Sequence, residues 1–157
     1  MKYNILLVLL FMLMTACQPS EVGLSSNQES QIKAEIETVF QTFSSSAKNL
    51  DHDLYLSFFD ENNFSILSAD GTTLNSKEAF KTKYLPQLAH IEKYISLEFD
   101  PINFIVVHSQ NAIIVNEFKA EVVLKNGDII STSGAGAQFW SKRSGQWKLL
   151  HISDSGT

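Results

Sequence analysis

The sequence predicts an α+β domain in which about three N-terminal helices pack on a strongly curved, mostly antiparallel sheet. Two observations carry this prediction. Apolar residues recur at helical spacing between residues 26 and 59, and four long segments rich in β-branched and aromatic residues follow from Tyr94 onward. Helices that precede a run of neighbouring strands must cover one face of the sheet to bury their apolar sides.

The helices have recognisable start signals. The first is predicted to begin at Ser26, because Ser26-Asn27-Gln28-Glu29 has the pattern of a capping box, and to reach about residue 50. Asp51 is expected to cap a short second helix, and Ser76 a third helix that Pro86 ends or kinks. Residues 64–67 lie between them as a short strand candidate.

Four long strands are predicted in the second half, over residues 94–107, 112–124, 128–142 and 146–155. Asn126-Gly127 is the strongest hairpin signal, because both central residues of a type I′ turn need positive φ. In the second of these strands the even positions are apolar except for Asn116, which therefore lies on the inner face. Residues 131–137 are all small, which predicts free space or a sharp bend and favours a cavity.

Length and charge bound the possible functions. The chain has 157 residues and a formal net charge of −5 with no run of cations, so it fits one domain and not a nucleic-acid-binding surface. Nucleic acid is therefore not an expected partner.

The N-terminus has the pattern of an export signal. Residues 5–14 form an apolar run of ten residues after Lys2, which is too short to span a bilayer as a helix but suits a signal peptide over residues 1–16. Met14-Thr15-Ala16-Cys17 resembles the bacterial lipobox, and this resemblance implies cleavage before Cys17 and its acylation, for example with palmitate. Residues 17–25 would then be a lipidated Cys followed by a flexible tether.

Acyl chains on Cys17 would make membrane lipid a partner and place the domain in the cell envelope. The residue that follows the Cys is Gln18 and not Asp. In an organism with two membranes, this choice resembles that of lipoproteins of the outer membrane facing the periplasm.

The end of the chain carries a family resemblance. The last predicted strand contains, in order, Trp147, Lys148, Leu149, Leu150, His151 and Ser155. This order resembles the SnoaL-like members of the nuclear transport factor 2-like superfamily and the association domain of calcium/calmodulin-dependent kinase, although Ser153 replaces the family's second His. The resemblance covers residues 26–157 and implies a cone-shaped roll, an open end that can hold a small molecule, and frequent dimerisation through the outer sheet face.

The superfamily does not share one chemistry. Its ketosteroid isomerases place a catalytic Asp shortly before the glycine that follows the first strand. Here the corresponding position falls near Leu67 or Ser68, neither of which is a carboxylate base, and Asp70 is expected to form the turn at Gly71.

The candidate binding residues are Tyr55, Asn116, Trp140, His151 and Ser153. His151 and Ser153 share side-chain parity with Trp147 and Leu149, which predicts one common face, while Asp154 faces away from His151. The alternative for His151 is a bond to neighbouring backbone, and for Trp140 a place in the core. The spacing of the four His residues predicts no metal site, and no cofactor is expected.

The favoured functional hypothesis is a membrane-anchored lipoprotein whose domain binds a small, largely apolar ligand or acts as an oligomerising module, without established catalysis. The first alternative is an isomerase, cyclase or dehydratase that uses His151 as acid or base. The second is a structural homodimer of the cell envelope.

Overall fold

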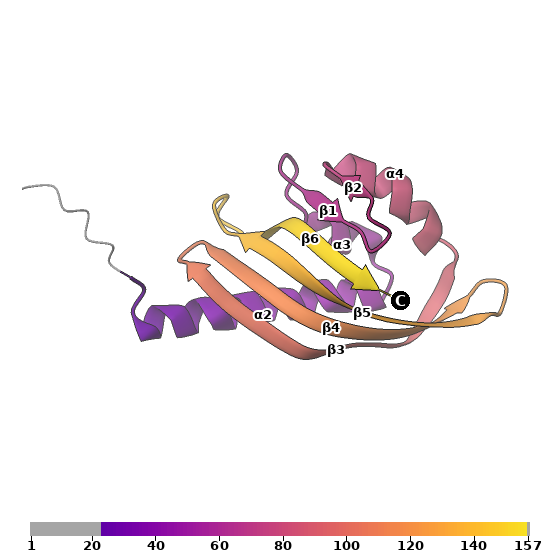
Figure 1. The fold of residues 1–157 in the computed structure, drawn as a ribbon, viewed down its shortest axis with the longest axis horizontal. Helices are drawn as coiled ribbons and strands as arrows, with labels where there is room; N and C mark the ends of the chain where they lie inside the picture. Colours follow the sequence, from indigo (N-terminus) through magenta and orange to yellow (C-terminus); the bar gives the residue numbers. More distant parts are fainter. Residues whose placement is uncertain (1–22, 157) are drawn as a thin grey trace, which may run out of the picture.

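A computed structural model describes residues 23–156 of the chain (Figure 1). No helix among these residues is both long and apolar enough to cross a membrane. Cys17 and the predicted signal peptide lie outside the described residues. The elements are α2 (Ser26–Lys48), α3 (His52–Ser57), β1 (Ser65–Leu67), β2 (Thr73–Leu74), α4 (Lys77–Leu88), β3 (Ile91–His108), β4 (Asn111–Leu124), β5 (Ile129–Ser141) and β6 (Lys148–Gly156).

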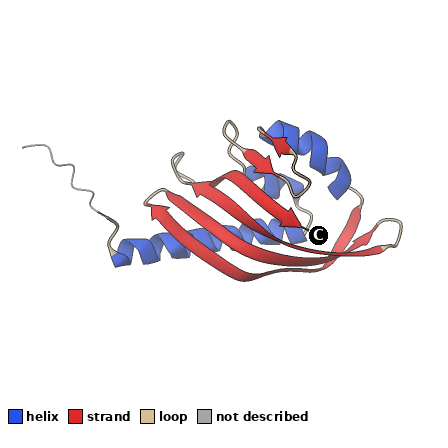
Figure 2. Cartoon of the chain, viewed as in Figure 1, coloured by secondary structure: helices blue, strands red, loops and turns tan. Residues whose placement is uncertain are grey.

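One sheet of six strands, in the order β2-β1-β6-β5-β4-β3, forms the body of the domain. Neighbouring strands are antiparallel except β1 and β6, which run parallel. The long strands curve along α2, and α3 and α4 lie at the end of the sheet that carries β1 and β2 (Figure 2). The α+β class, the three helices and the curved, mostly antiparallel sheet are therefore confirmed.

The helix α2 buries one side against the sheet. Ile36, Phe40 and Phe43 are at most 4% exposed and recur at the three- and four-residue spacing of a helix face. They pack in one core with Trp140 and Leu149 from the last two strands. This face holds the sheet around α2 and leaves α3 and α4 to cover the remaining part.

The cap of α2 lies one residue before the predicted position. The Oγ of Ser25 accepts a hydrogen bond from the backbone N–H of Gln28, and the Gln28 side chain accepts one from the N–H of Ser25. A capping box tolerates Gln as well as Glu at its third position, so Ser26 and Glu29 offered an equally good pattern in the wrong frame.

The caps of α3 and α4 are confirmed. The Asp51 side chain accepts from the N–H of Leu54, and the Ser76 side chain from the N–H of Ala79. Pro86 lies in the last turn of α4, which ends two residues later at Leu88.

The hairpin at Asn126-Gly127 is in the predicted place but is not a type I′ turn. Of the two residues Asn126 and Gly127, only Gly127 has positive φ, at 92°. The N–H of Leu124 donates to the carbonyl of Asp128, while the Asn126 side chain bonds Asp128. The hydrogen bonds between the side chain of Asn126 and Asp128 hold Asn126 in place. Asn126 therefore does not adopt the left-handed backbone conformation that a type I′ turn would require of it.

Candidate functional site

A cavity of about 480 Å³ lies between α3, α4 and the inner face of the sheet. Pockets that bind small molecules commonly enclose roughly 300–1,000 Å³ and have mostly apolar walls with few polar groups. The aromatic residues of the wall are Tyr55, Phe80, Tyr84 and Phe118. The other lining residues are Ile66, Ser68, Ala69, Asp70, Leu88, Thr132, Ile152, Asp154 and Gly156.

Asp154 brings a carboxyl group into this apolar cavity from β6. Burial raises the pKa of the Asp154 carboxyl from 3.8 to about 6. The Asp154 carboxyl has no hydrogen bond or ion pair with any residue in the range 23–156. It therefore differs from carboxyl groups that stabilise the fold through such contacts. A carboxyl group with a pKa near neutrality can hold or release a proton close to physiological pH.

Tyr55 stands beside Asp154 on the helical side of the cavity. Its ring stacks on Phe43 at a centroid distance of 4.8 Å, which fixes the side chain against α2. Burial, followed by the nearby charge of Asp154 and the Tyr94 hydroxyl, raises the pKa of the Tyr55 hydroxyl, so Tyr55 remains a neutral phenol. Tyr55 and Leu88 also line a second cavity of about 70 Å³ that reaches Tyr94 and His52.

The polar groups at the α4 side are already paired. The hydroxyls of Ser68 and Tyr84 form a hydrogen bond with each other. Asp70 accepts from the N–H of Thr72 at 2.8 Å and pairs with Lys83 Nζ at 3.3 Å, bonds that lower the pKa of its carboxyl. Asp70 is therefore the predicted turn former, and Asp154 is the one carboxyl lining the cavity that has no partner among the described residues.

A β-bulge in β6 changes which side chains reach the cavity. Trp140 pairs with Leu149, whereas Phe139 pairs with His151, so Leu150 is an extra residue in β6. Leu149 and Ile152 are both buried in the core, which requires the parity of the strand to switch between them. The switch places Ile152 and Asp154 on the inner face.

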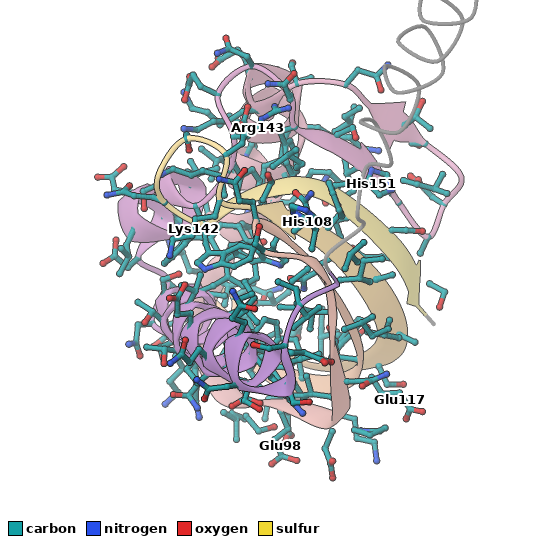
Figure 3. All side chains as sticks on the ribbon, turned by 90° about the vertical axis from the view of Figure 1, so that its left-hand side faces the viewer. Glu98, His108, Glu117, Lys142, Arg143 and His151 are labelled. Atoms are coloured by element: carbon teal, nitrogen blue, oxygen red, sulfur yellow. The ribbon has the colours of Figure 1, made fainter. Side chains whose placement is uncertain are left out.

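His151 and Ser153 consequently lie on the outer face, and the prediction that they share a face with Trp147 and Leu149 is wrong. Figure 3 shows His151 and Glu117 on the side of the sheet away from α2. His151 Nδ1 lies 2.8 Å from Ser65 Oγ in a hydrogen bond to the neighbouring strand β1. Asp154 does face away from His151, as predicted, but it is Asp154 that faces the cavity.

The remaining candidates divide between the core and the cavity wall. Trp140 is fully buried and its indole N–H donates to Gln138 at 3.0 Å, so it is a core residue and does not line the cavity. Asn116 lies on the inner face as predicted and is 4% exposed, although it is not one of the lining residues. Tyr55 is the one predicted binding residue that lines the cavity.

The small residues of β5 have a specific role. A Cβ at Gly136 would lie 2.8 Å from Asp154 Oδ1, and a Cβ at Gly134 would lie 2.1 Å from the carbonyl oxygen of Ser155. Both glycines therefore let the end of β6 approach β5 closely. The run of small residues at 131–137 was the sequence signal that pointed to this region, but it did not identify Asp154.

Within residues 23–156, no group of three or more His, Cys, Asp or Glu side chains has the arrangement of a metal site. Among the polar groups that line the cavity, the carboxyl of Asp154 and the phenol of Tyr55 stand against an apolar, aromatic wall, while the hydroxyls of Ser68 and Tyr84 and the carboxyl of Asp70 are already paired.

Comparisons with known proteins agree with this fold. The profile of the SnoaL-like domain matches residues 36–157. A nuclear transport factor 2-like superfamily protein from Salmonella enterica serovar Typhimurium is 21% identical, with a TM-score of 0.71 over 82% of this chain and 92% of that one. The association domain of CaMKII from C. elegans is 16% identical, with a TM-score of 0.63 over 83% and 99% of the two chains.

A candidate scytalone dehydratase from Novosphingobium aromaticivorans is 16% identical, with a TM-score of 0.71 over 85% of this chain and 89% of that one. None of the curated proteins matches the chain in sequence. At these identities the solved structures establish the fold alone, and it is the fold that the resemblance in the sequence implied.

Proposed function

This chain belongs to the SnoaL-like domain family, and we propose that its domain binds a small, largely apolar molecule in the cavity between α3, α4 and the sheet. The observation that carries the proposal is the cavity of about 480 Å³ itself. Its walls are mainly aromatic and aliphatic, and a single unpartnered carboxyl lies at Asp154. A domain that needed this space only for stability would gain by filling it with side chains, because unfilled apolar volume costs free energy.

The test is binding of the neutral apolar fluorophore N-phenylnaphthylamine to the purified domain. We expect saturable binding with increased fluorescence. Leu88→Trp places a larger ring in the cavity wall and should weaken binding several-fold, whereas Ala89→Trp adds the same ring at an exposed position outside the cavity and should not. Equal binding by both variants, or no saturable binding by the parent, would contradict the proposal.

A catalytic function is the second candidate, and the environment of Asp154 is what favours it. The family includes dehydratase and isomerase members as well as binding proteins. A carboxyl with a pKa of about 6 beside the Tyr55 phenol is suited to moving a proton to or from a bound substrate. Asp154 takes the role that the sequence assigned to His151, since His151 lies on the opposite face.

An oligomerising role is supported by the outer face of the sheet. Ile105, Val107 and Val115 are 40%, 55% and 42% exposed, and they lie on neighbouring positions of β3 and β4. Ile105, Ile113, Phe139 and His151 follow one another across four strands as a row of partners. Exposed apolar side chains in one patch favour a protein interface, and we assign a second copy of the chain to it. A related fold serves as an association domain in the C. elegans protein.

Membrane attachment through Cys17 completes the proposal. The sequence contains one Cys, placed where the apolar N-terminal run ends. Acylation there would tether the domain to a membrane of the cell envelope, the outer membrane facing the periplasm where two membranes are present, and several acyl chains would anchor it firmly. The first helix of the described residues begins at Ser26, and we propose that residues 18–25 serve as the tether.

A further inference from the structure

The unpartnered carboxyl of Asp154 carries information about the chemistry of the ligand. An acid buried in apolar surroundings destabilises the protein unless a charge or hydrogen-bond donor meets it. The titratable groups on the neighbouring elements are the phenols of Tyr55 and Tyr94, the carboxyl of Asp70, and the amino group of Lys83 in α4. Lys83 pairs with Asp70, so none of these groups supplies a counter-ion to Asp154.

A second acceptor lies in the same row of the sheet. Asn116 pairs with Gly136 across β4 and β5, and Gly136 pairs with Asp154 across β5 and β6. Because a Cβ at Gly136 would lie 2.8 Å from Asp154 Oδ1, the carboxylate extends over Gly136 toward the strand that carries Asn116. The Oδ1 of Asn116 is buried without a hydrogen-bond partner, while its amide group donates to the carbonyl of Glu117 at 3.3 Å.

The cavity wall around Asp154 favours a cation over a neutral group. No Lys, Arg or His from residues 23–156 lines the cavity of about 480 Å³, and its two charged lining residues are both acids. Tyr55, Phe80, Tyr84 and Phe118 line the cavity, and aromatic rings attract an ammonium ion through their electron-rich faces. The carboxylate of Asp154 and the aromatic residues of the wall together form the complement of a hydrophobic cation.

We propose that the ligand of this cavity is a hydrophobic amine, whose ammonium group pairs with the carboxylate of Asp154 and whose apolar body lies against the aromatic wall. This proposal rests on the proposed binding function and gives it a ligand class. The amine supplies the charge and the hydrogen-bond donors that the protein withholds from Asp154. A carboxylate ligand of the same shape would be repelled.

Three probes with the same ring system test the charge preference by calorimetry at about pH 8: naphthylethylamine, naphthylethanol and naphthylacetate. Because a hydrogen bond between two charged groups is stronger than one between neutral groups, the amine should bind at least about tenfold more tightly than the alcohol. The carboxylate should bind most weakly.

Two further measurements link the preference to Asp154. Asp154→Asn should bind the alcohol but lose the preference for the amine, and Glu117→Gln, which removes an exposed acid from the outer face, should keep it. In the parent protein the preference should shrink at about pH 4.5, where the carboxyl is protonated and the amine remains charged. This pH comparison uses the parent protein alone and does not depend on the folding of a variant.

The outcomes separate the two proposals. Equal binding of amine and alcohol, tighter binding of the carboxylate, or a preference that survives Asp154→Asn would overturn the amine assignment and leave the binding function intact. Failure of all three probes to bind would overturn both.

Discussion

Replacing Asp154 by Asn should make the protein more stable at neutral and alkaline pH. A rise of the carboxyl pKa from 3.8 to about 6 corresponds to roughly 3 kcal/mol lost by the folded protein when the group ionises. The folded protein holds this proton more tightly than the unfolded chain does. Its unfolding free energy therefore falls as the pH rises from about 4 to about 6 and remains reduced above that range.

Asn keeps the shape of the side chain without the charge, so it removes this cost. We expect Asp154→Asn to raise the free energy of unfolding by about 1–3 kcal/mol at pH 8, since part of the gain is offset by burying an amide, and the gain should disappear near pH 4. Urea unfolding followed by the fluorescence of the buried Trp140 and Trp147 measures both values.

The matched control is Glu117→Gln, an acid removed from the exposed outer face, which should change stability by no more than about 0.5 kcal/mol at either pH. A variant of Asp154 that is no more stable than the parent at pH 8, or whose gain is the same at pH 4, would refute the idea of an uncompensated carboxyl in the cavity. A gain in stability when the charge of a side chain is removed is the pattern expected of a residue that is kept for function.

The other proposals make three predictions. Metabolic labelling with an alkyne analogue of palmitate in a bacterial host should label the full chain but not Cys17→Ser, and equal labelling would exclude acylation at this residue. Light scattering should find a dimer that Val115→Glu converts to a monomer, whereas Lys119→Glu on the same strand should leave the dimer intact; a monomeric parent would remove the oligomerising role. If the domain moves a substrate proton, deuterium exchange followed by NMR across a panel of ketones should be lost in Asp154→Asn and retained in His151→Ala, and the reverse result would restore His151 as the acid or base.

Most of the fold could be predicted from the sequence, because helices, caps and strands are each indicated by patterns of neighbouring residues. These patterns are the helical spacing of apolar residues, two of the three caps, and the long segments rich in β-branched residues. Together they predicted each helix and each long strand among residues 23–156. The short strand β2 was not predicted, because two residues carry too little pattern to identify a strand. The same limit shifted the cap of α2 by one residue, since Ser25 and Ser26 each begin a plausible capping box.

The site was less predictable because one inserted residue decided it. The bulge at Leu150 reverses the side-chain direction of every later residue in β6. Asp154 therefore lies on the inner face, where His151 and Ser153 were predicted. Sequence spacing alone assumes an unbroken alternation and cannot reveal which residue is extra. No irregularity precedes Tyr55 or Asn116 on its own element, so Tyr55 lines the cavity and Asn116 lies on the inner face as predicted, although Asn116 does not line the cavity.

The most direct test of the binding cavity is a chemical-shift map of the backbone amides during titration with N-phenylnaphthylamine. We expect the largest changes at residues around the cavity, including Tyr55, Phe80, Phe118 and Asp154. Changes confined to the outer face around His151 and Val115, or no saturable changes at all, would contradict it.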